Sequence, residues 1–391
     1  MNKLKINDMF KLVRVLMVSM VALSILSGCN SEKASDESWS LTPFTKIDEV
    51  NPVLNPNPNS TFLCPVRMDT VHWEEKDVFN PAAVVKDGKV YLLYRAEDTV
   101  GKYAGTSRIG MAISADGLHF ETQPTPVFYP DNDAFSEYEW EGGCEDPRIV
   151  EDENGTYYMT YTAYNGDKAR LFVATSNDLI NWTKHGSVFN KTADGEYVKI
   201  WSKSGSVVTK RVGEKLVATK INGKYWMYFG ESNIYVATSD NLIDWEPVEE
   251  TDESKKQYDE MRKHEAFKII FAPRKGKFDS ELVEPGPPAI LTEKGIVFIY
   301  NSKNHKDYGD TNLAAGTYSA GQVLLDVNNP MQVIARTESN FFRPEKPYEI
   351  TGQVNSVSFL EGLVYFKDKW LLYYGTADSK IAVAESSTVL E

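Results

Sequence analysis

The sequence has few of the residues that build metal centres and disulfide frameworks. It contains 3 Cys and 5 His among 391 residues, and the histidines are scattered along the chain. No spacing of His and Cys typical of a zinc site occurs, so we predict no metal and no cofactor. A disulfide between Cys64 and Cys144 is compatible with an oxidising compartment, and the sequence leaves this pairing open.

Basic residues are also fewer than acidic ones. The chain has 42 Lys and Arg against 56 Asp and Glu, which gives a formal net charge of −14. An acidic protein of this kind repels nucleic acid and anionic lipid surfaces, so we expect no nucleic-acid partner. Aromatic residues make up 12% of the chain. They suffice for a large core and for a site in which sugar rings stack.

The N-terminus carries the clearest targeting signal. Basic residues precede an apolar run from Val15 to Leu26, and Ser27-Gly28-Cys29 follows it. The run is too short for a retained membrane span, and the pattern is typical of a bacterial lipoprotein signal peptide. We predict a signal peptide over residues 1–28, lipidation of Cys29, a flexible tether over 29–45 and one folded domain over 46–391. The protein would then be anchored in the cell envelope of a Gram-negative-type bacterium, on its periplasmic or surface face.

A strand pair of one pattern recurs five times. The aromatic runs that open the pairs are Lys89–Arg95, Thr156–Thr162, Lys224–Gly230, Gly295–Asn301 and Lys369–Gly375. Two copies share a tail, Ala174–Trp182 and Ala237–Trp245, and Ser114–Phe120 is a looser third. Repeated β units of this kind predict an all-β fold, a five-bladed β-propeller. The alternative is a β-sandwich with coincidental similarity.

Charged residues interrupt the apolar pattern at the ends of these strands. They are Arg95, Glu97, Asp98, Glu145, Asp146, Arg148, Lys220, Glu231, Glu281, Glu284 and Asp378. Because equivalent strand ends converge on the axis of a propeller, we expect a common polar pocket there. The segment Gly142–Arg148 has the highest density of charge. On its own, it could equally be a structural loop with an ion pair.

Six motifs in order resemble glycoside hydrolase family 130. They are Asn80–Ala83 with Leu93–Glu97, Glu145–Arg148 with Tyr161–Ala163, Lys220–Tyr225, Gly286–Pro288, Gly321–Asp326 and Tyr373–Asp378. The resemblance implies a five-bladed propeller that acts on β-mannoside oligosaccharides, as an inverting phosphorylase or an inverting hydrolase. It implies that Asp146 is the general acid, acting directly or through the mannose O3 hydroxyl. The substrate-binding residues would be Asn80, Arg95, Glu145, Arg148, Lys220, Asn301 and Asp378. Tyr164 and Tyr300 are added because they lie at strand ends, where sugar rings can stack on them.

The departures from the phosphorylase members favour hydrolysis. Those members carry a His-Arg pair where this chain has Phe229-Gly230 followed by Glu231, a His at the position of Asn301, and a small residue at that of Glu284. A phosphate dianion needs positive donors, whereas an inverting hydrolase needs a carboxylate base that activates water. We therefore expect an exo-acting β-mannosidase on β-1,2-linked mannosides, with Glu231 and Glu284 activating water.

Three alternatives stay open. A phosphorylase is compatible with the retained Lys220 and Arg148. An arabinan- or xylan-cleaving propeller is disfavoured because Asn80 occupies the position of its Asp base. A sugar-binding lipoprotein without catalysis is the third.

Overall fold

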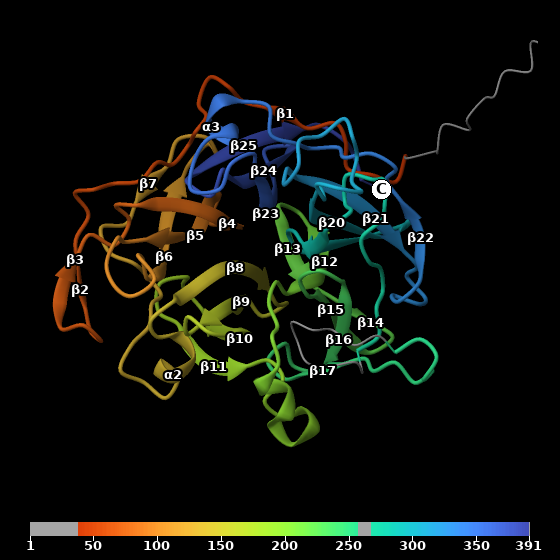
Figure 1. Ribbon diagram of the computed structural model, residues 1–391, viewed down its shortest axis with the longest axis horizontal. Helices are drawn as coiled ribbons and strands as arrows, with labels where there is room; N and C mark the ends of the chain where they lie inside the picture. Colours follow the sequence, from red (N-terminus) through yellow and green to blue (C-terminus); the bar gives the residue numbers. More distant parts are fainter. Residues whose placement is uncertain (1–37, 257–266, 391) are drawn as a thin grey trace, which may run out of the picture. The chain divides into compact units, whose positions relative to one another are not determined.

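The structure is a computed structural model that describes residues 38–256 and 267–390. The predicted signal peptide and the predicted lipidation site Cys29 lie outside these residues. No helix in the described ranges is long and apolar enough to cross a membrane. Trp39–Glu391 forms one compact unit, and it is mostly β-structure, as predicted (Figure 1).

Most strands fall, in chain order, into five groups of antiparallel partners, which we call sheets one to five. Short parallel bridges join sheet one to sheet two, sheet two to sheet three and sheet three to sheet four. Sheet one contains β4 (Asp77–Lys86), β5 (Lys89–Glu97), β6 (Ser107–Ser114) and β7 (Glu121–Thr122). Sheet two contains β8 (Gly143–Glu151), β9 (Tyr157–Tyr164), β10 (Ala169–Ser176) and β11 (Thr183–Ser187). Sheet three contains β12 (Ser206–Val212), β13 (Lys215–Ala218), β14 (Lys220–Ile221), β15 (Lys224–Phe229), β16 (Tyr235–Ser239) and β17 (Trp245–Pro247).

The last two sheets complete the series. Sheet four contains β18 (Leu282–Pro285), β19 (Ala289–Thr292), β20 (Gly295–Lys303), β21 (Tyr318–Leu325) and β22 (Val333–Arg336). Sheet five contains β23 (Ser358–Phe366), β24 (Lys369–Thr376), β25 (Lys380–Ser386) and, from the other end of the chain, β1 (Thr45–Lys46). The other elements of the described ranges are the hairpin β2 (Phe62–Cys64) and β3 (Asp69–Val71) and the short helices α2 (Ser136–Glu139), η1 (Thr192–Lys199) and α3 (Pro347–Ile350).

The hydrophobic core is divided among the sheets in a closed succession. One cluster of buried side chains joins sheets one and two, and the next three join sheets two and three, three and four, and four and five. A fifth cluster joins sheet five to sheet one, where Val383 and Tyr373 pack with Leu92 and Tyr94. Each sheet therefore buries both of its faces against its two neighbours, which explains why the strands read as nearly continuous apolar runs.

The shared sequence tails have the same local structure. In the turns after β6, β10 and β16, a serine hydroxyl accepts a hydrogen bond from the backbone N–H three residues later, at Gly117, Leu179 and Leu242. These three residues have φ of 79°, 72° and 65°. The strained leucines are held by burial, and Trp182 and Trp245 each donate to the leucine carbonyl of their own tail. The repeat is therefore structural.

The N-terminal boundary of the folded unit differs from the prediction. Trp39 and Leu41, inside the predicted tether 29–45, are buried in the core. The backbone N–H and C=O of Leu41 are both bonded to the side chain of Gln322. The tether boundary at residue 45 is therefore wrong, because two apolar residues in a polar stretch suffice to dock this segment.

The two cysteines that could pair do not do so. Cys64 and Cys144 are both free thiols, and both are buried. Cys64 lies in the β2–β3 hairpin, whereas Cys144 lies in the first strand of sheet two. Cys144 is part of the core between sheets one and two, so it serves there as a small apolar side chain.

Candidate active site

Irregularities in the first strands of the sheets present polar side chains. Bulges place an extra residue at Asn80 in β4, at Asp146 in β8 and at Glu361 in β23. A bulge re-aims a side chain away from its ladder. Asn80 and Asp146 have φ of 46° and 48°, a region that Asn and Asp tolerate better than other side chains. Three of the five sheets thus use one backbone device to bring a polar group out of an apolar strand.

Asp146 lies at the centre of a network of charges. Its Oδ1 accepts hydrogen bonds from Asn80 Nδ2 at 3.0 Å and from Arg95 Nη1 at 3.2 Å. Its Oδ2 is 3.5 Å from the ammonium of Lys203. The same Arg95 pairs with Glu97 at 2.7 Å and with Glu145 at 3.0 Å. The carboxylate is therefore held from both sides, by two side chains of sheet one and by Lys203 from the segment before β12.

Close packing at Asn80 depends on a glycine of sheet five. A Cβ on Gly375 would lie 2.4 Å from Asn80 Oδ1 and 3.0 Å from the Asn80 backbone nitrogen. Only glycine permits this approach, because real Cβ contacts are never so short. Gly375 therefore allows β24 to hold the residue that donates to Asp146.

Lys203 links Asp146 to Glu231 and Glu284, the two residues that we expect to activate water. Its ammonium is 3.7 Å from Glu284 Oε1, which also accepts a short hydrogen bond from Ser204 Oγ. Glu231 accepts a hydrogen bond from Trp201 Nε1 at 2.9 Å, and its charge acts on both Lys203 and Glu284. The structure therefore brings Asp146, Glu231 and Glu284 into one site, with a single ammonium between them.

Arg148 connects this site to two other strands. Its guanidinium donates to the carbonyls of Gly286 and Pro285 at 2.9 and 2.6 Å, and to the carbonyl of Asp146 at 3.3 Å. It pairs with Glu361 at 2.9 Å, and both side chains are almost completely buried. Arg148 thus ties the backbone of Asp146 to the segment that follows Glu284. We call the eleven residues of this network the polar cluster: Asn80, Arg95, Glu97, Glu145, Asp146, Arg148, Lys203, Glu231, Glu284, Glu361 and Asp378.

The carboxyl groups of the polar cluster have different pKa values, because burial and neighbouring charges act on each of them to a different extent. Burial alone would raise the pKa of Asp146, but the charges of Arg95 and Lys203 and the Asn80 hydrogen bond lower it below its usual range. Burial raises the pKa of Glu145 to about 7, against the opposing charge of Arg95. Burial likewise raises the pKa of Glu284. Asp146 is thus ionised in the free protein, while its neighbour Glu145 keeps a proton up to about neutral pH.

The titration of Asp378 predicts a pH-dependent stability. Burial raises its pKa to about 7 from an ordinary value of 3.8, although Arg95 opposes the shift. Between about pH 4 and about pH 7 the folded state therefore keeps a proton that the unfolded state has lost, so the free energy of unfolding falls as pH rises. We expect a shallower fall in Asp378→Asn, measured by urea unfolding across this range. Asp240→Asn, which changes an exposed aspartate, is the control and should keep the pH dependence of the wild type. If Asp378→Asn also keeps it, Asp378 is not the group that titrates.

Three residues predicted for the site lie elsewhere. Lys220 is exposed, with its ammonium over the ring of Tyr225. The Tyr300 hydroxyl is buried against Asp279 and Arg336, inside sheet four. Asn301 is fully buried, and its amide exchanges hydrogen bonds with the backbone of Leu360. Tyr300 and Asn301 therefore tie neighbouring segments together, and Asn301 lies opposite Glu284 in the β18–β20 pair.

Tyr164 lies at the rim of the site. It is half-buried at the end of β9, with its ring 6.5 Å from that of Trp201, the partner of Glu231. Asp378 follows β24 with a φ of 49°, and its carboxyl is close enough to Arg95 and Asp146 for their charges to shift its pKa. Arg95, Arg148, Asn80, Glu145, Tyr164 and Asp378 are thus gathered around Asp146.

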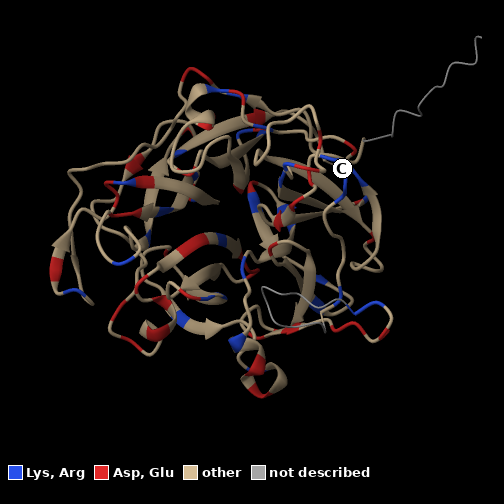
Figure 2. Cartoon of the chain, in the orientation of Figure 1, with Lys and Arg blue, Asp and Glu red and all other residues tan. Residues whose placement is uncertain are grey.

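The sequence reading missed two members of the cluster. Glu361 is the one acid in the apolar run Ser358–Phe366, and this isolation was a signal for a bulge position. Lys203 sits in the polar stretch Trp201–Gly205 before β12, which has neither a motif nor a periodic pattern. Figure 2 shows both acidic and basic positions on the strands that border the centre of the unit. Among the described residues, no group of three or more His, Cys, Asp or Glu is arranged to hold a metal ion.

Comparison with known proteins shows the family of this chain. The model of glycoside hydrolase family 130, described as β-1,4-mannooligosaccharide phosphorylase, matches residues 45–391. A 1,2-β-oligomannan phosphorylase from Thermoanaerobacter sp. (strain X514) is 34% identical over 321 residues, which are 80% of this chain and 90% of the relative.

Two solved structures are more similar. A glycosyl hydrolase from Bacteroides ovatus is 49% identical, with a TM-score of 0.83 over 89% of this chain and 94% of that one. The second is 48% identical, with a TM-score of 0.84 over 89% and 94% of the two chains. It was solved in work on the glycoside hydrolases within this family of mannoside phosphorylases that target β-1,2-mannosidic linkages in Candida mannan. This protein therefore belongs to glycoside hydrolase family 130.

Proposed function

We propose that the protein is an inverting, exo-acting β-mannosidase that hydrolyses β-1,2-linked mannosides. In this proposal the five sheets are the blades of a β-propeller, and the polar cluster lies on its axis. The observation that carries the proposal is the charge of the cluster. Its three cations, Arg95, Arg148 and Lys203, are surrounded by seven carboxyl groups, so acidic groups outnumber basic ones even where Glu145 and Asp378 keep a proton up to about pH 7.

This charge ratio favours water over phosphate as the attacking group. A phosphate dianion needs donors whose positive charge is available. Here Arg95 is paired with three carboxylates, Arg148 with Glu361, and Lys203 lies beside Asp146 and Glu284. Glu231 and Glu284 add negative charge where the attacking group would enter. Two carboxylates repel phosphate but orient a water molecule and remove its proton.

The roles of the carboxylates follow from single displacement. An inverting glycosidase places an acid at the leaving oxygen and a base beside a water on the opposite face of the sugar. Asp146 is the acid, acting directly or through the mannose O3 hydroxyl. Glu231 and Glu284 are the groups that activate the water. Tyr164 and Trp201 at the rim offer ring faces to the sugar.

The proton of the acid needs a source, because Asp146 is ionised in the free protein. Arg95 and Lys203 keep the pKa of Asp146 low, whereas burial keeps that of the adjacent Glu145 high. The two carboxyls titrate as a pair that retains one proton up to about neutral pH. We infer that this shared proton moves to Asp146 when a bound sugar displaces water from the site. Activity should then decline as the pair loses its proton.

The N-terminal sequence supports a location for this activity. The apolar run before Cys29 and the small residues that precede it are the features of a lipoprotein signal. The proposal therefore includes a lipid anchor at Cys29 in the cell envelope.

Product analysis on β-1,2-mannobiose tests the proposed function. We expect mannose to be released at the same rate with and without inorganic phosphate, and we expect the first product to be the α-anomer, detected by NMR. The reason is that the cluster activates water and displaces the leaving group in one step. Strict dependence on phosphate with mannose 1-phosphate as the product would establish the phosphorylase instead, an activity that the Thermoanaerobacter relative has.

A further inference from the structure

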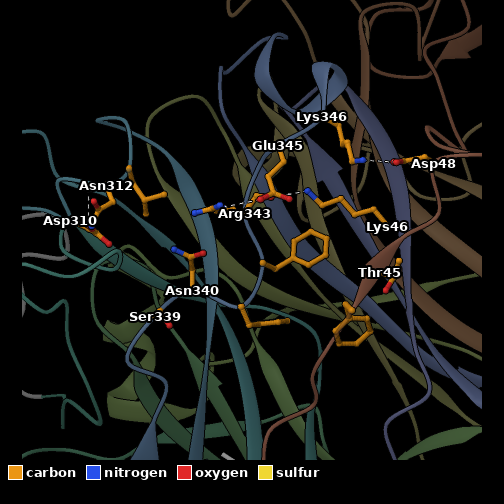
Figure 3. A pocket seen from close by; sticks show the side chains of 14 residues that line it. Thr45, Lys46, Asp48, Asp310, Asn312, Ser339, Asn340, Arg343, Glu345 and Lys346 are labelled. Carbon is orange, nitrogen blue, oxygen red and sulfur yellow. Dashed lines mark hydrogen bonds and ion pairs between the residues drawn. The ribbon is translucent and has the colours of Figure 1, made fainter. Parts of the chain in front are cut away.

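We propose that a pocket between sheets four and five is a second carbohydrate-binding site, which holds an outer part of a long mannoside chain. The pocket has a volume of about 640 Å³ (Figure 3). Its walls come from β1 and the residues beside it, from the loop between β20 and β21, and from the segment over residues 339–346. None of its lining residues belongs to the polar cluster. The proposal rests on the proposed function for the class of ligand.

The topology relates the pocket to the proposed active site. The polar cluster is built from the start of first strands, such as Asp146 in β8, and from the end of second strands, such as Arg95 in β5. The β20–β21 loop follows β20, whose end lies opposite the start of β18, and the segment 339–346 precedes the first strand of sheet five. Because the strands alternate in direction, both segments lie at the strand ends that carry the cluster. Two of the three walls of the pocket are thus on the same side of the sheets as the polar cluster, and the third, β1, pairs with the end of β25 that is farther from Asp378.

Aromatic rings form part of the wall. Phe44 and Phe341 are each half-buried, with ring centroids 6.2 Å apart and tilted by 47°. Phe342 is buried behind them, with the ammonium of Lys46 4.9 Å from its ring centroid. Partly exposed rings in a recess offer apolar faces to the C–H faces of a sugar. Aromatic rings in a pocket whose other lining residues are mostly polar are typical of a site for a ligand that has both apolar and polar faces.

Neutral polar groups are available next to these rings. The side chains of Thr45, Ser339 and Asn340 line the pocket and make no hydrogen bond to any described residue. In Figure 3, Asn340 lies between Ser339 and the guanidinium of Arg343, with Asp310 and Asn312 on the same side. A hydroxyl donates and accepts, so it can satisfy amide, hydroxyl and carboxylate groups together. Sugar hydroxyls match this mixture of donors and acceptors.

The charges of the lining disfavour an anionic ligand. Lys46 pairs with Glu349 at 2.7 Å, Arg343 with Glu345 at 3.0 Å, and Lys346 with Asp48. The carboxylate of Asp310 adds a further negative charge to the wall. Each cation is thus already neutralised, whereas a phosphate site would keep cations available. A neutral polyhydroxylated chain fits the charge, the rings and the unbonded polar groups.

The test combines binding with activity on two substrate lengths. Asp146→Asn, which removes the proposed acid, is titrated by calorimetry with long β-1,2-mannan chains and with β-1,2-mannobiose. We expect a second binding event with the long chains that disappears when Asn340→Ala and Arg343→Ala are added. In the protein with Asp146 intact, Asn340→Ala with Arg343→Ala should raise KM on long chains about fivefold. The kcat/KM on mannobiose should stay unchanged.

A matched variant and the pattern of results make the outcomes distinct. Arg211→Ala is the matched control. It removes an exposed arginine that stacks on Tyr365, at the end of β12 that is farther from Lys203. It should change neither the second binding event nor the KM on long chains. The absence of a second binding event in Asp146→Asn would overturn the proposal, as would an unchanged KM on long chains in Asn340→Ala with Arg343→Ala. If mannobiose is not cleaved while long chains still bind through Asn340 and Arg343, the pocket stands and the proposed activity falls.

Discussion

Asp146→Asn should lower kcat/KM on β-1,2-mannobiose by about 10²–10⁴-fold, the usual contribution of a general acid. The amide keeps the shape of the side chain and can still contact Asn80 and Arg95, but it supplies no proton to the leaving oxygen. Steady-state release of mannose, measured with the wild type and the variant at equal folded concentration, checks this expectation. A loss smaller than about tenfold would exclude Asp146 from that role.

Two controls separate chemistry from folding. Asp240→Asn removes an exposed aspartate that pairs with Lys224 at 2.6 Å, and it should leave the activity unchanged. The urea midpoint of Asp146→Asn should fall below that of the wild type, because Arg95, Lys203 and Asn80 lower the pKa of Asp146 and its charge therefore stabilises the folded state at neutral pH. Binding of mannobiose by calorimetry therefore reports whether the site is still assembled in the variant. Binding without turnover identifies a chemical role.

Arg148→Met should cost about 3–5 kcal/mol of unfolding free energy, because it removes one partner of a buried ion pair. The Glu361 carboxylate would stay buried without a counter-charge, and three backbone carbonyls would lose their donor. Burial already raises the pKa of Glu361 well above its usual range even with Arg148 present. Urea unfolding at neutral pH measures the loss, which should lessen as pH falls and Glu361 becomes protonated.

The double variant makes this expectation specific to the pair. Adding Glu361→Gln to Arg148→Met removes the uncompensated charge, so part of the lost stability should return. The single change Glu361→Gln should cost less than Arg148→Met, since a neutral amide can remain next to the guanidinium. Strictly additive effects in the cycle would show that the two residues act independently. A cost below about 1 kcal/mol for Arg148→Met would contradict the buried pair.

The repeats predicted the organisation of the strands well. Each aromatic run forms an inner strand of a sheet, with partners on both sides, and the shared tails form turns with the same serine hydrogen bond. This part was predictable because alternation of apolar residues and turn chemistry are local properties. Charged residues at strand ends predicted the position of the site for the same reason. Asp146, Glu231 and Glu284 come together because equivalent ends of different sheets meet.

The errors arise where long-range packing decides the direction of a side chain. Tyr300 and Asn301 lie near the end of β20, a position where we expect side chains to face the site. Instead, the Tyr300 hydroxyl donates to Asp279, and the Asn301 amide bonds to the backbone of a neighbouring strand. Nothing in the local sequence distinguishes such directions. Lys203 supplies the ammonium that was assigned to Lys220. The two lysines lie on either side of β12, and only the path of the chain through sheet three decides which one faces the site.

The fifth sheet has a consequence for the order of folding. Its outer strand β1 comes from the start of the folded unit and pairs with β25 near the end of the chain, with Thr45 opposite Glu385. Contacts over such a separation form late, because nearly the whole chain must be enclosed between them. The first four sheets can each form from contiguous sequence, whereas the fifth needs both ends. We therefore expect the pairing of β1 with β25 to be a late step of folding. A chain that lacks β25 cannot form this pairing.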